Sequence, residues 1–378
     1  MNEYDPGAAR RSGPPADPST GIVPSGQPLV GPAAGREADV ARGSAGERVR
    51  DRTSGRPLSH DDYRAVVRSR MADLDRLSPL PAGAGRPVSV ASGSDGAPDP
   101  AAELVPDERL IVALDVDGTI LDVNGRVSER MMAALTRMRA YGARIVISTG
   151  RGIEAALPVA RHVGLTDGWM ICANGAITLR MDPAAPRGYE VADSVTFDPS
   201  DVIAALSSAV PDGIIAVEAL DGGFRVSRPF PDGELIEDQR VVPPQEMGSE
   251  PVTRVVLRAP GMAVEEFSAL VAGCGLYSVE YAIGWTAWLD VAPEGVTKAS
   301  ALRALAARLG TGAERVVAVG DGANDIEMIR WAGVGAVMGS APRAVRDCGD
   351  LVTGPVWHDG CAALLDAVVE RTRRRSQS

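Results

Sequence analysis

Four short polar clusters lie along the chain, each directly after an apolar run or at the start of a helical pattern. They are Asp115-Val116-Asp117-Gly118-Thr119 after LIVAL, Ser148-Thr149-Gly150-Arg151 after RIVI, Lys298 behind Gly295-Val296-Thr297, and Gly320-Asp321-Gly322-Ala323-Asn324-Asp325 after RVVAV. Ligands of open parallel sheets bind beyond the carboxyl ends of the strands. We therefore expect the four clusters to meet at one edge of a sheet.

Together the clusters supply carboxylates, a hydroxyl, an ammonium group and glycine-rich backbone amides. Carboxylates that gather without arginine partners repel one another unless a hard cation lies among them, and oxygen ligands suit Mg²⁺. A phosphate would complete the charge balance, because phosphoryl transfer needs mainly in-line positioning and neutralisation of its oxygens. An aspartate can act as the nucleophile through an aspartyl-phosphate. The clusters therefore indicate phosphoryl transfer at a magnesium site.

Each cluster taken singly has another interpretation. A D-x-D pair also binds metal in nucleotide-sugar transferases. Ser, Thr and Gly serve strand-to-helix turns for backbone reasons, and Asp321, Asn324 and Asp325 could cap the helix that follows them. Two acids and an amide exceed what a cap requires, and all four clusters occur in order at predicted strand ends. Coincidence is a poor explanation of that order.

Lys298 is the only lysine among 39 basic residues. Arginine has replaced lysine wherever a generic positive charge suffices, so the retained residue marks a place that arginine cannot fill. A compact ammonium beside a phosphate and a carboxylate is such a place, because the planar guanidinium is larger and its donors point in fixed directions. The alternative is retention by chance.

From Arg109 onward, short apolar runs alternate with amphipathic helices, which is typical of a parallel sheet built from βαβ units. We predict helices that begin behind Ser128, from Ile153 to His162 and from Lys298 to Leu309. Between residues 182 and 284 the pattern changes to the strands GYEVAD, GIIAVEAL, GFRVS, TRVVLRA and YSVEYAI, mixed with two helices. The sequence thus predicts a core of residues 106–181 and 285–372, interrupted by an inserted α+β domain of residues 182–284.

Residues 1–105 contain thirteen of the 28 prolines and many Gly, Ser and Ala residues. Such a composition cannot bury enough apolar surface to offset the entropy of ordering, so we predict a disordered extension. The stretch from Ser59 to Leu77 is an exception, because its apolar residues recur at helical spacing behind possible caps. It could form a lone helix that docks on the core.

Composition also disfavours several classes of protein. The formal net charge of −11 argues against nucleic-acid binding. No apolar run is long enough to cross a membrane and the start lacks the apolar stretch of a secretory signal, so we expect a cytoplasmic protein. The four cysteines are widely spaced and are expected to be reduced thiols. His60, His162 and His358 lie outside the clusters, which disfavours a histidine phosphatase.

LDVDGT, ISTGR, GVTKASAL and GDGANDIEM resemble the four ordered motifs of the haloacid dehalogenase (HAD) superfamily. The insert between the second and third motifs is similar to the larger, C2-type cap of its Cof-like subfamily (type IIB). The resemblance spans about residues 108–370 and implies a Rossmann-like core with an inserted α+β cap. It also implies a Mg²⁺-dependent hydrolase that acts on a small phosphorylated metabolite such as a sugar phosphate.

The resemblance also implies roles for the acidic residues. Asp115 would attack phosphorus, while Asp117 would protonate the leaving oxygen and later take a proton from water. The metal would be held by the Asp115 carboxylate, the Asp117 backbone carbonyl and Asp321, with support from Asp325 through water.

The remaining motif positions are implied to contact the substrate. Thr149 and Lys298 would bind the transferring phosphoryl group, with Asn324 nearby. Arg151 and Asn174 would face the substrate entrance, although Arg151 could instead be a surface residue at a helix start. The motifs leave open a phosphotransferase or phosphosugar mutase of the same fold, and a non-catalytic regulatory member. They identify neither the substrate nor the oligomeric state.

Overall fold

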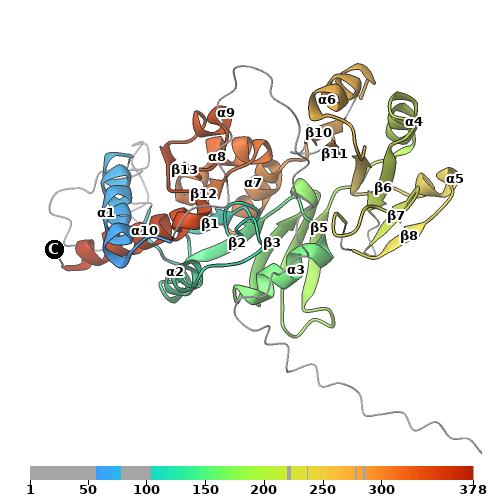
Figure 1. The fold of residues 1–378 in the computed structure, drawn as a ribbon. Coiled ribbons are helices and arrows are strands. Elements are labelled where there is room, and N and C mark those ends of the chain that lie inside the picture. The colour runs from blue at the N-terminus through green and yellow to red at the C-terminus, as the bar shows by residue number, and fades with distance from the viewer. Residues whose placement is uncertain are drawn as a thin grey trace, which may run out of the picture.

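The computed structural model describes residues 57–77, 104–218, 223–235, 237–276, 279–283 and 287–377 (Figure 1). Within these ranges the strands form two sheets, one of eight strands and one of six. The larger sheet is built from both sides of the insertion, and the smaller one lies in the inserted segment. The predicted division into an interrupted core and an insert is therefore visible in the strand pairing.

The core sheet has the strand order β14-β13-β12-β1-β2-β3-β4-β5. Pairs from β14 through β3 are parallel, whereas β4 and β5 extend the sheet as antiparallel strands. The strands are β1 (Ile111–Leu114), β2 (Arg144–Ser148), β3 (Gly168–Cys172), β4 (Ile177–Met181), β5 (Tyr189–Ser194), β12 (Val316–Gly320), β13 (Val334–Val337) and β14 (Leu351–Val352). The predicted parallel α/β core is confirmed.

Both faces of the core sheet are covered by helices, which explains the unbroken apolar runs of its strands. Val112 and Leu114 pack with α2 (Glu129–Ala140), α3 (Ile153–His162) and α10 (Gly360–Gln377). Ile111 and Ala113 point the other way, toward α7 (Lys298–Arg308) and α8 (Ile326–Trp331). A short helix, α9 (Arg343–Arg346), precedes β14. The predicted cap of α2 is present, because Ser128 Oγ accepts from the backbone N–H of Met131 at 3.0 Å.

The inserted domain is a six-stranded sheet in the order β10-β11-β9-β6-β7-β8. Its pairs are antiparallel except for the parallel pair of β7 and β8. Two helices cover one face through a cluster that includes Leu206 and Phe267. The elements are α4 (Ser200–Ala209), β6 (Ile214–Glu218), β7 (Phe224–Val226), β8 (Gln239–Val241), α5 (Pro244–Met247), β9 (Arg254–Arg258), α6 (Val264–Gly273), β10 (Val279–Ile283) and β11 (Trp288–Pro293).

The observed boundaries of the insert differ from the predicted 182 and 284. β5 pairs with β4 and so belongs to the core sheet, because the two strands form a hairpin at its edge. β11 pairs with β9 and β10 and so belongs to the inserted sheet. Strand composition alone does not tell which sheet a strand joins. The chain enters the insert after Ser194 and leaves it after Pro293.

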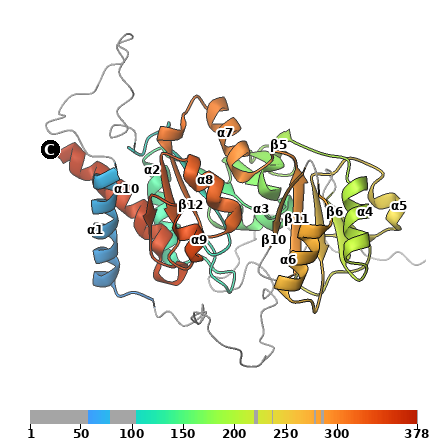
Figure 2. The ribbon, with the colours of Figure 1, turned by 90° about the horizontal axis from the view of Figure 1, so that it is seen from above.

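Within residues 1–105, the suggested helix near Ser59–Leu77 is present as α1 (His60–Leu77). It lies beside α10 at the end of the molecule opposite the insert (Figure 1, Figure 2). Its buried Tyr63 donates to Asp366 on α10 at 2.8 Å, and Arg371 of α10 donates to Asp75 at 2.7 Å. The disorder predicted for most of the remaining extension falls outside the described residues.

The docking of α1 is testable at Leu74, which is completely buried against the core. We expect Leu74→Ala to lower the free energy of unfolding by about 2–5 kcal/mol, because it leaves a cavity between packed helices. Leu77→Ala is the matched control, since Leu77 is 40% exposed on the same helix, and it should cost less than about 0.5 kcal/mol. Chemical denaturation measures both; equal effects would contradict the docking of α1.

No helix in the described ranges combines the length and apolar character needed to cross a bilayer. All four cysteines are free thiols, as predicted, and Cys172 and Cys361 are buried.

Candidate active site

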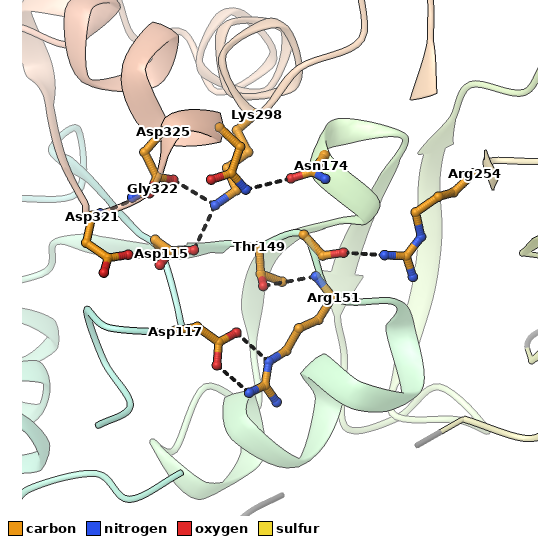
Figure 3. Close-up of polar contacts among 12 residues, drawn as sticks. Asp115, Asp117, Thr149, Arg151, Asn174, Arg254, Lys298, Asp321, Gly322 and Asp325 are labelled. Carbon is orange, nitrogen blue, oxygen red and sulfur yellow. Dashed lines mark hydrogen bonds and ion pairs between the residues drawn. The ribbon is translucent and has the colours of Figure 1, made fainter. Parts of the chain in front are cut away.

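The polar clusters meet at the carboxyl edge of the core sheet (Figure 3). Asp115 follows β1, Thr149 follows β2 and Asp321 follows β12, and the register pairs β1 in parallel with both neighbours. Parallel strands in register end at the same level, so three segments distant in sequence place their polar residues together. The predicted gathering of the clusters at one edge is observed.

Lys298 is the link between two of the acids. Its Nζ lies 2.7 Å from Asp115 Oδ1 and 2.7 Å from Asp325 Oδ1, and the residue is only 1% exposed. It is the first residue of α7, whose capping box is formed by Thr297 and Ser300. Burial alone would lower the pKa of Lys298, but Asp115 and Asp325 outweigh it and raise that pKa above its ordinary value. Lys298 is therefore a buried ammonium.

Three carboxylates converge beside this ammonium. Oxygens of Asp115, Asp321 and Asp325 all lie within 4.8 Å of one another, and the three residues are buried. Burial and the charge of Asp325 raise the pKa of Asp115, although Lys298 lowers it in part. One ammonium does not neutralise three buried carboxylates. A hard divalent cation fits this donor set, since Mg²⁺ prefers oxygen ligands.

Backbone groups hold the acids in place. Asp325 Oδ2 accepts from the backbone N–H groups of Asp321, at 3.0 Å, and of Gly322, at 2.9 Å. Gly118 has a φ of +81°, and a Cβ there would lie 2.2 Å from Asp321 Oδ2. Position 118 therefore requires glycine for two reasons, the left-handed backbone conformation and the close approach of the Asp321 carboxylate.

Asp117 stands apart from the buried cluster. Its side chain is 61% exposed and accepts from Arg151 through both oxygens, at 2.6 and 2.8 Å. The Arg151 side chain is only 14% exposed, so this residue is a partner of Asp117 and not a surface residue at the start of α3. Burial would lower the pKa of Arg151, but its hydrogen bonds and charge interaction with Asp117 hold that pKa above its ordinary value.

The other predicted contact residues surround this pair. Thr149 is 1% exposed, and its Oγ1 accepts from the Arg151 backbone N–H at 3.1 Å. Asn174 lies after β3 in the left-handed region, with a φ of 53°, and its Oδ1 accepts from Asn324 Nδ2 at 2.9 Å. The structure therefore brings the nine predicted residues to one region. The roles assigned to them stay predictions.

The insert brings a further group of charged residues, not predicted from the sequence, to the same loop. Arg254 on β9 donates to the carbonyl of Gly150 at 2.7 Å (Figure 3). Glu218 and Glu237 approach the neighbouring Gly152, and Asp290 pairs with Arg254. No motif marked these residues, because their position depends on how the insert sits on the core.

Two tryptophans, Trp285 and Trp288, lie near the end of the insert. Trp285 lies outside the described residues. Trp288 contacts Phe230 edge to face and donates to Asp290 at 3.0 Å. It belongs to an apolar cluster of the inserted sheet.

The motifs imply a parallel sheet with acidic, hydroxyl and ammonium groups at its carboxyl edge and an inserted α+β domain. The structure has both, and the insert contacts the loop after β2. The chain matches the haloacid dehalogenase-like hydrolases over residues 112–209 and 263–365, more than half of its length, and it belongs to that family. The predicted placement in the Cof-like branch and the enzyme class are confirmed by this match and by the relatives.

Two relatives show the extent of the similarity. The 5-amino-6-(5-phospho-D-ribitylamino)uracil phosphatase YitU of Bacillus subtilis is 25% identical, over 68% of this chain and 96% of its own. The phosphoglycolate phosphatase of Halobacterium salinarum is 27% identical, over 68% of this chain and 96% of its own.

Solved structures support the same fold. A haloacid dehalogenase-like hydrolase from Bacteroides thetaiotaomicron superposes with a TM-score of 0.58 at 21% identity, over 68% of this chain and 99% of its own. The HAD subclass IIB sugar phosphatase BT4131 gives a TM-score of 0.58 at 23% identity, over 68% of this chain and 98% of its own.

Proposed function

We propose that this enzyme is a Mg²⁺-dependent phosphatase that hydrolyses a small organic phosphate monoester through an aspartyl-phosphate on Asp115. The observation that carries the proposal is the buried Lys298 bridge between Asp115 and Asp325, with Asp321 in the same cluster. An ammonium and three carboxylates at the end of parallel strands suit a phosphoryl group and a hard cation together.

In the first half of the reaction, the Asp115 oxygen that is not bonded to Lys298 attacks phosphorus. The new oxygen–phosphorus bond forms as the bond to the leaving oxygen breaks, and Asp117 transfers its proton to that oxygen. Lys298 and Thr149 would contact the transferring group, because Lys298 bonds to Asp115 and Thr149 follows β2, the strand next to β1. Lys298 thereby stabilises charge on the phosphoryl oxygens.

In the second half, Asp117 removes a proton from water, whose oxygen attacks phosphorus. The bond between Asp115 and phosphorus breaks, which releases inorganic phosphate and restores both acids. The Asp115 carboxylate, the Asp117 backbone carbonyl and Asp321 would hold Mg²⁺, with support from Asp325 through water. The bound ion would supply further neutralisation of the phosphoryl charge.

Arg151 constrains this cycle. Both oxygens of Asp117 accept from Arg151, so Asp117 must release at least one of these hydrogen bonds before it can carry a proton to the leaving group. A substrate that draws Arg151 toward itself would free Asp117. Asn174 and its hydrogen-bond partner Asn324 lie in the same region of the site and would contact the substrate.

The substrate class follows from the relatives named above, which act by name on a phosphorylated ribitylaminouracil and on phosphoglycolate. We infer a small phosphorylated metabolite, such as a sugar phosphate, for this chain. The net charge of −11 still argues against nucleic acid, and the cytoplasmic location stays a prediction.

The experiment is release of inorganic phosphate from sugar phosphates, nucleotides and an aryl phosphate, with Mg²⁺ or with EDTA. We expect turnover with Mg²⁺, a fall of at least about 100-fold in EDTA, and recovery when Mg²⁺ is restored. Turnover unchanged in EDTA would contradict the metal assignment. Transfer of phosphate to a second sugar without release would favour a phosphotransferase or mutase.

A further inference from the structure

One guanidinium joins the inserted domain to the loop that follows β2. Arg254 Nη1 donates to the Gly150 carbonyl at 2.7 Å and lies 3.2 Å from Asp290 Oδ1. Its Nε donates to Glu218 Oε2 at 3.0 Å, and its side chain is 5% exposed. The same group thus has two anchors in the insert and one in the core.

The insert holds this guanidinium in place before it meets the core. Glu218 is the register partner of Arg254 on the adjacent strand, and Asp290 lies on the strand at the other side. The guanidinium also lies 5.2 Å from the centre of the Phe224 ring. The fork geometry of arginine lets it keep both carboxylates and still direct a donor outward.

The core partner is the backbone of the catalytic loop itself. Gly150 lies between Thr149 and Arg151, and Arg151 donates hydrogen bonds to Asp117. At Gly152, a Cβ would lie 2.4 Å from Glu218 Oε1 and 2.9 Å from Glu237 Oε1, so the insert packs directly on this backbone. The position of the loop is thereby tied to the position of the insert.

We propose that Arg254 is a positioning residue that couples the seating of the insert to the geometry of the loop from Thr149 to Gly152. Arg254 keeps its two carboxylate partners, Glu218 and Asp290, within the insert, so its third bond, to the Gly150 carbonyl, depends on how the insert is seated on the core. That bond fixes the loop and, through Arg151, the orientation of Asp117.

The test uses Arg254→Lys, which keeps the charge but cannot reach Glu218, Asp290 and the Gly150 carbonyl together. Arg258→Lys is the matched control. Arg258 lies on the same strand and pairs with Glu234 at 2.6 and 2.8 Å, entirely within the insert. Both variants lose ion-pair contacts of an arginine within the insert, with Glu234 for Arg258 and with Glu218 and Asp290 for Arg254. Only Arg254→Lys also loses a bond to the core.

We expect Arg254→Lys to lower kcat about 10- to 100-fold, because the loss of one charge-assisted hydrogen bond corresponds to a change of about this size. KM should change less than about threefold, because the phosphoryl contacts stay in place. Both variants should lower the melting temperature by a similar amount, but Arg258→Lys should change kcat less than about twofold. Equal changes of kcat in both variants, or none in Arg254→Lys, would overturn the proposal.

The kcat measurement rests on the proposed function, so a second readout is independent of activity. Hydrogen exchange of a peptide spanning residues 148–157 should accelerate in Arg254→Lys and stay unchanged in Arg258→Lys. If the wild type releases no phosphate, the proposed function fails while this exchange still decides the role of Arg254. If Arg254→Lys does not fold, Asp290→Asn is measured instead and should shift exchange in the same direction; no shift would refute the coupling.

Discussion

Asp115→Asn is expected to abolish turnover, with kcat lowered by at least about 10⁴-fold, because an amide oxygen cannot form the phosphoryl intermediate. The variant should fold. The raised pKa of Asp115 means that the folded protein without metal disfavours the ionised carboxylate, and a neutral isostere removes that cost. The melting temperature of the metal-free variant should therefore equal or exceed that of the metal-free wild type.

Asp122→Asn is the control for this prediction. Asp122 follows the same motif, and its Oδ1 accepts from the backbone N–H groups of Asn124 and Arg126. Its replacement should leave kcat within about twofold of the wild type. An Asp115→Asn enzyme that kept a tenth of the activity would exclude Asp115 as the nucleophile.

Lys298→Met is expected to damage both stability and activity. It leaves Asp115 and Asp325 without their common partner, and removing one member of a buried ion pair costs about 3–5 kcal/mol. The phosphoryl group also loses a cationic contact, so kcat should fall by about 10³-fold or more. Thermal unfolding and phosphate release measure the two effects.

The size of the ammonium is tested by Lys298→Arg. The guanidinium does not fit between two carboxylates that each lie 2.7 Å from one nitrogen, so this variant should also lose most activity. Arg303→Met is the control, since Arg303 is an exposed cation on the same helix. Wild-type activity in Lys298→Arg would mean that the single lysine was retained by chance.

The acidic and hydroxyl residues of the active site could be located from the sequence because their clusters follow strands of the parallel sheet. Once β1, β2 and β12 are recognised, the sheet itself brings Asp115, Thr149 and Asp321 to one edge. Lys298 was indicated both by composition, as the only lysine, and by its place in the third polar cluster. Its two carboxylate partners lie where the motif order implied.

The features that could not be predicted from the sequence depend on contacts between the core, the insert and α1. β5 and β11 have ordinary strand sequences, and only pairing assigns the first to the core and the second to the insert. Arg254 is one arginine among many in the sequence, and its role becomes visible only through the Gly150 carbonyl. The docking of α1 likewise rests on partners such as Asp366, which lies about three hundred residues away.

The most direct test of the central claim is to trap the phosphoryl group on the enzyme. Wild-type enzyme with Mg²⁺ and its best substrate is quenched in acid during turnover, reduced with borohydride and digested. The masses of the peptides are then measured by mass spectrometry. We predict that Asp115 alone is converted to homoserine, the product of an acyl phosphate, and that Asp115→Asn shows no conversion. Phosphate release without any modification of Asp115, or with modification of another residue, would contradict the aspartyl-phosphate mechanism.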